Sequence, residues 1–372
     1  MSRGSICPAC GATNTAAWRL DYAAFRHLDF APLLPPPGAA AWENRLCACA
    51  GCGVLYRLLD AAQRDALAAL YRSDDYAGHR EDHRVRGADG ALRPAAEAQA
   101  DALLAAWPEA ARRAAILDIG CFDGKLLAAL GERTGTARLV GYDVAARPEF
   151  PRRPRFAFHT GERRALAGPF DLVLVSQSLI YIDDLAELFA ELRTRLVDDG
   201  RVFVHVPDTS LRPASLLLAD QVFHFTPASL ASLFGRHGYA VEFLHGHPFR
   251  RDILLLARRR ADAEAQPVVA GDEGLFGRLD DLAARLRAIP GRELAVFGTT
   301  IEAAFACNVL GERASRCVDE NPDKQGHQFN GLPVVPPGGL DPGNTCVVPM
   351  GREAAPLVER LSAQYPGRFL LV

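Results

Sequence analysis

The stretch "ILDIGCFDGKLL", residues 116–127, decides the fold of the central part of this chain. It is an apolar run that ends in Asp118 and continues through Gly120 and Gly124 to a helical pattern that begins at Lys125. A short strand, a glycine turn and a helix start form a cradle in which backbone amides approach a nucleotide-like ligand. The stretch therefore predicts a strand–loop–helix binding unit.

The glycine spacing and a second acid narrow the class of ligand. Gly120 and Gly124 have the spacing G-x-x-x-G and not the G-x-G-x-x-G of dinucleotide folds, which disfavours NAD. Asp143 ends the next apolar run, "LVGYD", and a carboxylate there can accept hydrogen bonds from both hydroxyls of a ribose. A glycine pair alone is common at strand–helix turns, but the order acid, glycine loop, second acid is more specific.

Outward from this unit, strand-like and helix-like patterns alternate from about residue 90 to 260. Strand-like runs such as "FDLVLVS" and "RVFVHVP" flank the helical pattern "DLAELFAELRTRL". Such alternation predicts an α/β fold with a mostly parallel, doubly wound sheet. A second strand–turn–helix, "ELAVFGTTIEAAFACNVL", follows a polar linker. We therefore expect three domains, at residues 1–85, 86–260 and 270–372.

Charge and targeting patterns limit the partners. The net charge of the 372 residues is −3 and the arginines are scattered, which argues against a nucleic-acid partner. The first ten residues, "MSRGSICPAC", hold no apolar segment typical of a secretory signal, and no run is long enough to cross a bilayer. We expect a cytoplasmic protein without a membrane partner, and the oligomeric state stays open.

Cysteines near the amino terminus have metal-ligand spacing. Cys7 and Cys10 form one C-x-x-C pair, and Cys49 and Cys52 form another. Two such pairs can place four thiolates around a structural Zn²⁺ ion. Cys47 is an alternative to Cys49 as the third ligand. A redox role is the competing interpretation, although a closed four-thiolate site leaves no open position.

The stretches "LDIGCFDG", "VGYD" and "FDLVLVSQSLIYIDD" resemble class I S-adenosylmethionine-dependent methyltransferases over residues 115–258. The resemblance implies that S-adenosylmethionine is the cofactor, with Asp118 and Gly120 at its methionine end, Asp143 at the ribose and Glu162 near the adenine. Ser176 and Gln177 would line the sulfonium. The loop residues that complete the expected cofactor site are Cys121, Asp123 and Gly124. In that fold the seventh strand lies antiparallel at the sheet edge.

The loop "IGCFDGKLL" is more specifically similar to the "IGCNDG" loop of C-methyltransferases that act on nucleotide-linked deoxysugars. That family resembles this chain over its whole length, with a four-cysteine zinc domain, a methyltransferase core and a C-terminal Rossmann-like domain. The segment "CVDENPDKQGHQFNGLPVVPP" is similar to its third domain. The resemblance implies a small-molecule acceptor, a nucleotide-sugar, which the third domain helps to bind.

The chain departs from that family where the acceptor is expected. Tyr181, in "YIDD", stands at the place of a family histidine, and only His224 remains of a Tyr-x-Glu-His cluster. Tyr76, in "LYRSDDYAGH", matches the segment that closes over the acceptor. His224 is the first candidate for a general base and Tyr181 the second. The alternative for His224 is a structural hydrogen bond at a helix that begins with Thr226 as N-cap and Pro227 as first residue.

Three functional hypotheses follow. The first is methyl transfer to a small molecule, by C-methylation of a nucleotide-linked sugar or by O- or N-methylation. The second is an RNA base methyltransferase, because some of these also carry an N-terminal four-cysteine module. The third is a non-catalytic protein that retains the cofactor fold.

Overall fold

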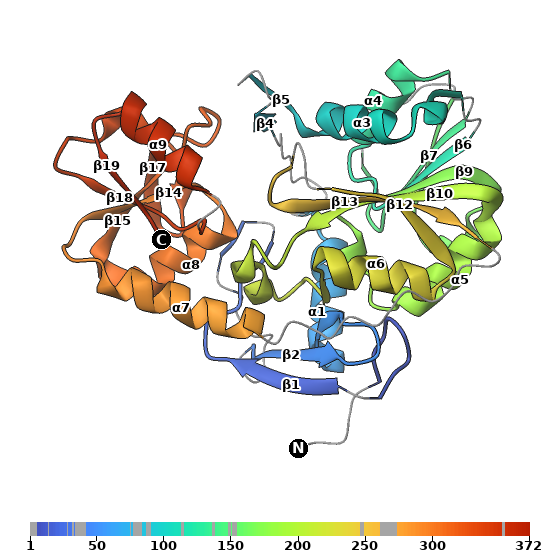
Figure 1. Ribbon diagram of the computed structural model, residues 1–372, viewed down its shortest axis with the longest axis horizontal. Helices are drawn as coiled ribbons and strands as arrows, with labels where there is room; N and C mark the ends of the chain where they lie inside the picture. Colours follow the sequence, from blue (N-terminus) through green and yellow to red (C-terminus); the bar gives the residue numbers. More distant parts are fainter. Residues whose placement is uncertain are drawn as a thin grey trace. The chain divides into compact units, whose positions relative to one another are not determined.

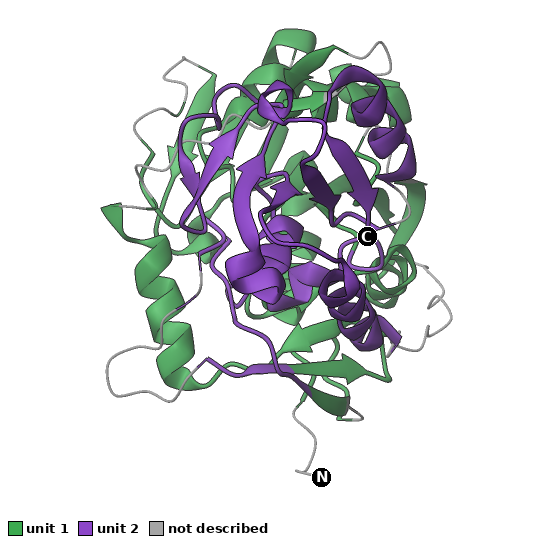
Figure 2. Ribbon diagram, turned by 90° about the vertical axis from the view of Figure 1, so that its left-hand side faces the viewer, with its two compact units in different colours: residues 1–18, 46–208, 222–271 green, residues 19–45, 209–221, 272–372 purple. Residues whose placement is uncertain are grey.

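The computed structural model separates into two compact units, which Figure 2 colours differently. The first comprises residues 1–18, 46–208 and 222–271, and the second comprises residues 19–45, 209–221 and 272–372. The residues that the structure describes are 6–13, 15–27, 29–31, 33, 42–74, 76, 84–86, 91–112, 115–135, 138–147, 150, 155–245, 249–260, 274–351 and 354–372.

A seven-stranded sheet forms the centre of the first unit, with the order β12-β13-β10-β9-β6-β7-β8. Its strands are β6 (Ala115–Ile119), β7 (Arg138–Tyr142), β8 (Phe156–His159), β9 (Phe170–Ser176), β10 (Leu196–Pro207), β12 (Tyr239–His245) and β13 (Asp252–Arg259). The strands from β10 to β8 are parallel, whereas β13 is antiparallel to both of its neighbours. The predicted mostly parallel sheet is confirmed. The expectation that the seventh strand, β13, lies at the edge is wrong, because β12 pairs with β13 on the side away from β10 and is itself the edge strand.

Helices cover both faces of this sheet, as Figure 1 shows. On one face lie α3 (Ala95–Ala106) and α4 (Lys125–Arg133), and on the other lie α5 (Leu185–Arg195) and α6 (Pro227–Arg236). The predicted helical pattern forms α5, whose apolar residues Leu185, Leu188, Phe189 and Leu192 are buried. The predicted start of α6 is confirmed, because the Thr226 side chain accepts a hydrogen bond from the Ser229 amide and Pro227 opens the helix.

A small sheet has the order β1-β2-β3-β11. Cys49 ends its strand β2, and Cys52 lies in the turn between β2 and β3. The strand β11, from a segment far away in the sequence, joins the sheet beside β3. In particular, β11 pairs antiparallel with β3, so His224 lies opposite Leu55. The strands of this sheet are β1 (Thr15–Leu20), β2 (Asn44–Cys49), β3 (Leu55–Arg57) and β11 (Phe223–His224). The helix α1 (Ala61–Tyr71) follows β3, and β4 (Arg84–Arg86) and β5 (Leu92–Pro94) form a separate two-stranded sheet. Short 3₁₀ turns in the first unit are η1 (Pro108–Arg112), η2 (Arg163–Ala165) and η3 (Leu179–Tyr181).

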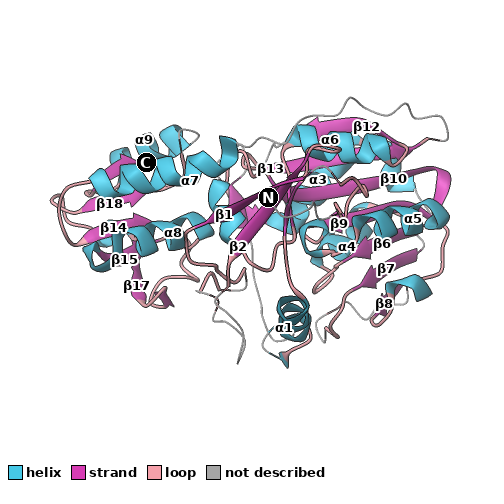
Figure 3. Cartoon of the chain, turned by 90° about the horizontal axis from the view of Figure 1, so that it is seen from below, coloured by secondary structure: helices cyan, strands magenta, loops and turns pink. Residues whose placement is uncertain are grey.

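The second unit contains a six-stranded, mostly parallel sheet with the order β16-β17-β15-β14-β18-β19. Figure 1 shows its helices on both faces, with α7 and α8 on one and α9 on the other, and Figure 3 shows the same helices and strands from below. Its elements are η4 (Pro213–Leu217), α7 (Gly274–Ala288), β14 (Leu294–Phe297), α8 (Ile301–Leu310), η5 (Gly311–Arg313), β15 (Ala314–Val318), β16 (Gln328–Phe329), β17 (Leu332–Val335), η6 (Pro337–Gly339), β18 (Thr345–Val348), α9 (Ala355–Gln364) and β19 (Arg368–Leu371).

None of the helices in the described ranges could cross a membrane. The longest of them, α7, has 15 residues, whereas a membrane-spanning helix needs about 20 apolar ones.

Candidate functional site

The glycine loop joins β6 to α4 at the carboxyl edge of the parallel strands. Gly120 has a φ of 76°, and a Cβ atom added there would lie 2.3 Å from Cβ of Ser178. Gly124 precedes α4 in the left-handed region, with a φ of 75°. The amides of Gly120 and Cys121 both donate to the carbonyl of Tyr142, at 2.7 and 3.0 Å. Glycine at 120 is therefore required both by backbone conformation and by the close approach of the next loop.

Asp118 lies in β6, directly before this loop, and has a buried carboxylate. Its side chain is 2% exposed, and Oδ1 has no hydrogen-bond partner among the described residues. Burial, with added repulsion from Asp143 and Asp123, raises the pKa of Asp118 to about 8. A buried carboxylate oxygen without a donor costs free energy, so it indicates a ligand that donates to it.

Asp143 follows β7 and is held from two sides. Its Oδ2 accepts from the Phe122 amide at 2.9 Å, and its Oδ1 accepts from the Ala145 amide at 3.2 Å. Burial raises the pKa of Asp143, and the charge of Arg147 opposes that rise. The carboxylate is thus fixed beside the glycine loop, where a ribose is expected to bind.

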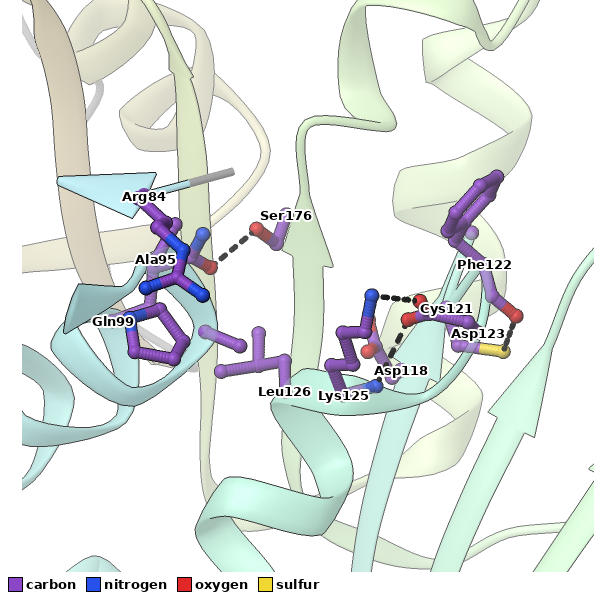
Figure 4. Close-up of a pocket in the computed structure, with 13 residues that line it drawn as sticks. Arg84, Ala95, Gln99, Asp118, Cys121, Phe122, Asp123, Lys125, Leu126 and Ser176 are labelled. Carbon is purple, nitrogen blue, oxygen red and sulfur yellow. Dashed lines mark hydrogen bonds and ion pairs between the residues drawn. The ribbon is translucent and has the colours of Figure 1, made fainter. Parts of the chain in front are cut away.

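A cavity of about 250 Å³ opens next to the loop. Figure 4 shows Ser176 and Gln99 approaching each other from β9 and α3, with Asp118 and Lys125 near the loop. Ser176 Oγ donates to Gln99 Oε1 at 2.7 Å. The residues that line the cavity are Arg84, Pro94, Ala95, Ala96, Gln99, Asp118, Gly120, Cys121, Phe122, Asp123, Lys125, Leu126 and Ser176.

Most of the predicted cofactor residues meet at this cavity. Those that line it are Asp118, Gly120, Cys121, Asp123 and Ser176. Gly124 continues the same loop, and Gln177 follows Ser176 with a φ of 55°, its amide donating to the His205 carbonyl at 2.7 Å. Glu162 is different, because it is exposed after β8 and does not line the cavity.

Sequence reasoning missed several residues of the site. Phe122 and Lys125 belong to the quoted stretch but have no motif role, whereas Arg84 and Gln99 come from segments far from it in sequence. Gln99 carried only a weak signal, as a polar residue in the Ala-rich stretch that forms α3, and only the structure shows that it is buried, with 8% exposure. Arg147 gave no signal, because its importance depends on contacts with residues 25 and 71 positions away.

An aromatic row, defined here as Tyr181, Tyr71, Tyr76 and Phe122, leads from η3 to the glycine loop. The ring centroids are 5.6 Å apart for Tyr181 and Tyr71, 4.9 Å for Tyr71 and Tyr76, and 6.1 Å for Tyr76 and Phe122. The row brings the predicted acceptor residues Tyr76 and Tyr181 into one connected group next to the cofactor loop.

Arg147 packs between the last two rings of the aromatic row. Its guanidinium carbon lies 4.0 Å from the Phe122 centroid and 4.2 Å from the Tyr76 centroid, and Nη1 donates to the Tyr76 carbonyl at 2.6 Å. Arg147 is 5% exposed. Desolvated cation–π contacts contribute about 2 kcal/mol each, so this arrangement is strongly held.

His224 is buried in β11 beside this region. It is 2% exposed, and neither ring nitrogen has a partner among the described residues. Burial, together with the charge of Arg57, lowers the pKa of His224 well below its ordinary value, so the ring is neutral. The Val222 amide donates to the Ile180 carbonyl at 2.8 Å, which joins the segment before β11 to η3.

The structural alternative for His224 lacks its expected bond. The start of α6 is capped by Thr226 and Ser229, which bond each other and not the His224 ring. A helix-start role would have required such a bond. Both ring nitrogens are without a partner among the described residues, and His224 is not among the residues that line the cavity beside the glycine loop.

The four predicted zinc ligands converge. The ligand atoms of Cys7, Cys10, Cys49 and Cys52 all lie within 4.8 Å of one another. The Sγ atoms of Cys7 and Cys52 are 3.9 Å apart, and those of Cys10 and Cys49 are 3.6 Å apart. Tetrahedral zinc with bonds of about 2.3 Å places sulfurs ~3.8 Å apart, so the spacing fits zinc. Cys47 is outside this cluster.

Comparison with known proteins agrees with this geometry. Residues 91–245 match the family "Methyltransferase domain". Trans-aconitate 2-methyltransferase of Acidovorax ebreus is 30% identical over 189 residues, which are 46% of this chain and 72% of that protein. The chain belongs to the S-adenosylmethionine-dependent methyltransferases. The α/β sheet, parallel except for the antiparallel β13, fits the class I methyltransferase fold.

Other similarities are shorter or confined to the fold. Trans-aconitate 2-methyltransferase of Deinococcus radiodurans is 31% identical over 98 residues, and the match spans 25% of this chain and only 38% of that relative. A solved S-adenosylmethionine-dependent methyltransferase from Mesorhizobium loti is 21% identical, with 46% of this chain and 100% of that one covered and a TM-score of 0.37. Human N-acetylserotonin methyltransferase is 15% identical, with 44% of this chain and 52% of that one covered and a TM-score of 0.37.

Proposed function

We propose that this methyltransferase binds S-adenosylmethionine at the cavity beside the glycine loop and methylates a small molecule. The observation that carries the proposal is the unpartnered Oδ1 of buried Asp118 beside Gly120, where no side chain fits. A cationic amine of the ligand would neutralise the Asp118 carboxylate, and Asp143 would accept hydrogen bonds from the ribose hydroxyls. Ser176, which ends β9, and Gln177, which follows it, would face the sulfonium.

When bound, S-adenosylmethionine supplies an electrophilic methyl group on its sulfonium. The protein's own task is to orient the acceptor and remove a proton where the acceptor atom must lose one. His224 is our candidate for that base, because it is neutral, buried and has both ring nitrogens unpartnered among the described residues. Tyr181 is the second candidate, and Tyr76 would contact the acceptor from the aromatic row.

The acceptor that we propose is a nucleotide-linked sugar, methylated on carbon, or on oxygen or nitrogen. The support is the resemblance of three successive sequence blocks, now joined by the converged cysteine cluster and a separate α/β sheet in the second unit. Under this proposal the chain has a zinc domain at 1–85, a methyltransferase domain at 86–260 and a Rossmann-like substrate domain at 270–372.

A small carboxylic acid is the second candidate acceptor. Both curated relatives are named trans-aconitate 2-methyltransferase, and Arg84 lines the cavity. An arginine can bind a carboxylate in a bidentate fashion. This alternative predicts methyl-ester formation, which needs no proton acceptor and therefore no role for His224.

Two measurements test the proposal. Calorimetric titration with S-adenosylhomocysteine should show one site per chain, and Asp118→Asn should weaken it while Gly135→Ala does not. Transfer of labelled methyl groups should then be measured with a panel of nucleotide-sugars and a panel of tricarboxylic acids. Label in sugars supports the first acceptor class, and base-labile label in acids supports the second. Absence of S-adenosylhomocysteine binding to the wild-type protein would refute the proposed function.

A further inference from the structure

Arg147 contacts both sides of the proposed reaction centre. On the cofactor side, its guanidinium lies over the ring of Phe122, the loop residue whose amide donates to Asp143. On the acceptor side, it lies over the ring of Tyr76 and donates to the Tyr76 carbonyl. These two sides are 46 residues apart in sequence, from Tyr76 to Phe122, and Arg147 bridges them.

The contacts on each side are fixed by the backbone as well as by the rings. Phe122 has a φ of 49°, an uncommon conformation for a residue other than glycine, and Asp143 Oδ2 holds its amide. Tyr76 is held by its amide, which donates to Ser73 Oγ at 3.2 Å, and by its ring contact with Tyr71. A shift of Asp143 or Phe122 therefore changes the position of the Arg147 guanidinium.

We propose that Arg147 is a positioning residue that couples cofactor binding at Asp143 and the glycine loop to the placement of Tyr76 and the aromatic row. The inference rests on the proposed function, because it takes the loop as the site of S-adenosylmethionine. Ribose hydroxyls that bind Asp143 restrain that carboxylate and the Phe122 amide bound to it. Phe122 then holds the guanidinium, and the guanidinium holds the Tyr76 carbonyl and ring.

The coupling has a consequence for the order of binding. Without a bound cofactor, the contact of Arg147 with Phe122 is less restrained, and the segment around Tyr76 is less ordered. With the site filled, the aromatic row is already in place when the acceptor arrives. Because the protein segment around Tyr76 is then already ordered, acceptor binding costs less conformational entropy of the protein, and the acceptor binds the cofactor complex more tightly than the free protein.

Hydrogen exchange with S-adenosylhomocysteine as the probe tests this coupling without an acceptor. In the wild-type protein, the ligand should slow exchange both at the loop amides of residues 120–124 and at the amides of Arg72, Ser73 and Tyr76, by about fivefold or more. In Arg147→Met, the loop amides should still be slowed, whereas the amides near Tyr76 should change by less than about twofold.

Arg138→Met is the matched control. The Arg138 guanidinium also lies over an aromatic ring, 4.5 Å from the Phe170 centroid, and donates to the Pro169 carbonyl at 2.6 Å. Arg138 is the first residue of β7, whereas Asp143 follows its last residue, so the two lie at opposite ends of the strand. Its exchange pattern should be that of the wild-type protein.

Each other outcome is decisive. If the ligand binds the wild-type protein but leaves the amides near Tyr76 unchanged, or if Arg147→Met keeps their protection, the coupling is wrong and the proposed function stands. If Arg147→Met no longer binds the ligand, Arg147 belongs to the cofactor site itself and the coupling role is also wrong. If the wild-type protein does not bind the ligand, the proposed function fails first.

Discussion

At the scale of single residues, two buried groups of the first unit have hydrogen-bonding capacity that is not used among the described residues. One is the Oδ1 atom of Asp118 and the other is the His224 ring. A protein retains such groups against their desolvation cost where function requires them. Both residues were candidates from sequence patterns, but only the structure shows their burial and unmet bonds.

The His224 ring provides a test of this view. We expect His224→Leu to leave the melting temperature unchanged or to raise it, since an apolar side chain removes two unpartnered nitrogens. Turnover with the identified acceptor should fall at least about tenfold, while affinity for S-adenosylhomocysteine stays constant. Thermal unfolding measures the melting temperature, initial rates measure turnover, and titration calorimetry measures the affinity.

His237 is the matched control for this substitution. Its Nε2 bonds the Ala9 carbonyl at 2.9 Å, and its ring stacks on Phe189 with centroids 4.0 Å apart. His237→Leu should therefore lower the melting temperature. Unchanged turnover in His224→Leu, or a fall in its melting temperature like that of His237→Leu, would return His224 to a structural role.

The pKa of Asp118, raised to about 8 by burial, predicts a pH dependence of cofactor binding. Below that pH the empty site holds a protonated carboxyl, and binding of an ammonium group requires its ionisation. Affinity for S-adenosylhomocysteine should therefore rise as pH increases from about 6 to 8, by up to about tenfold per pH unit. Titration calorimetry at several pH values measures the affinity. Titrations in buffers of different ionisation enthalpy should also show that a proton is released when the ligand binds.

The free energy of unfolding changes with pH in the opposite direction to the ligand affinity. A carboxyl whose pKa is raised by folding stabilises the native state most below its ordinary pKa, and this contribution is lost as pH rises through about 8. Asp143, whose pKa is also raised, adds the same trend. Asp118→Asn should flatten both curves. A pH-independent affinity in the wild-type protein would show that Asp118 is not the group that binds the amine.

At the scale of elements, the turn from β6 to α4 depends on Gly120. Gly120→Ala places a Cβ atom 2.3 Å from Cβ of Ser178 and imposes a φ of 76° on alanine. Such overpacking costs about 1–3 kcal/mol, and we expect the loop to shift and affinity for S-adenosylhomocysteine to fall at least about tenfold. Titration calorimetry checks the loss.

Gly135→Ala is the control for this element, because nothing lies within 4 Å of a Cβ atom there. It should leave affinity unchanged and stability within about 0.5 kcal/mol. Equal affinities of the two alanine variants would mean that the glycine loop does not form the cofactor site.

At the scale of the whole molecule, we expect one structural zinc ion per chain, bound by the four-cysteine cluster. Cys52→Ser should lose the metal and lower the melting temperature, because zinc binding by such a site contributes directly to folding. Metal analysis of the purified protein and thermal unfolding measure these effects. A metal-free wild-type protein that stays folded would contradict the assignment.

Cys47→Ala distinguishes the two candidates for the third ligand. Cys47 is buried, 1% exposed, but lies outside the converged cluster. This variant should keep its zinc, whereas Cys49→Ala should not. The reverse result would make Cys47 the ligand, in agreement with the alternative that the spacing of the cysteines leaves open.

The amino-acid sequence by itself determined the local units of this protein. The run through Asp118, Gly120 and Gly124 predicted the strand, turn and helix start, and the alternating patterns predicted the parallel sheet. The two C-x-x-C pairs predicted the cysteine cluster. These features depend on neighbours in sequence, through apolar periodicity and the backbone freedom of glycine, so they can be recognised without a tertiary structure.

Only the tertiary structure decided which distant side chains meet at the site. The pairing of β11 with β3, the edge position of β12, the approach of Gln99 to Ser176 and the packing of Arg147 between two rings all join segments that are remote in sequence. No local pattern encodes such contacts, because they depend on how whole elements pack. The glycine loop could be predicted because it lies in one continuous stretch, whereas the rest of the proposed cofactor site and the aromatic row come from several segments.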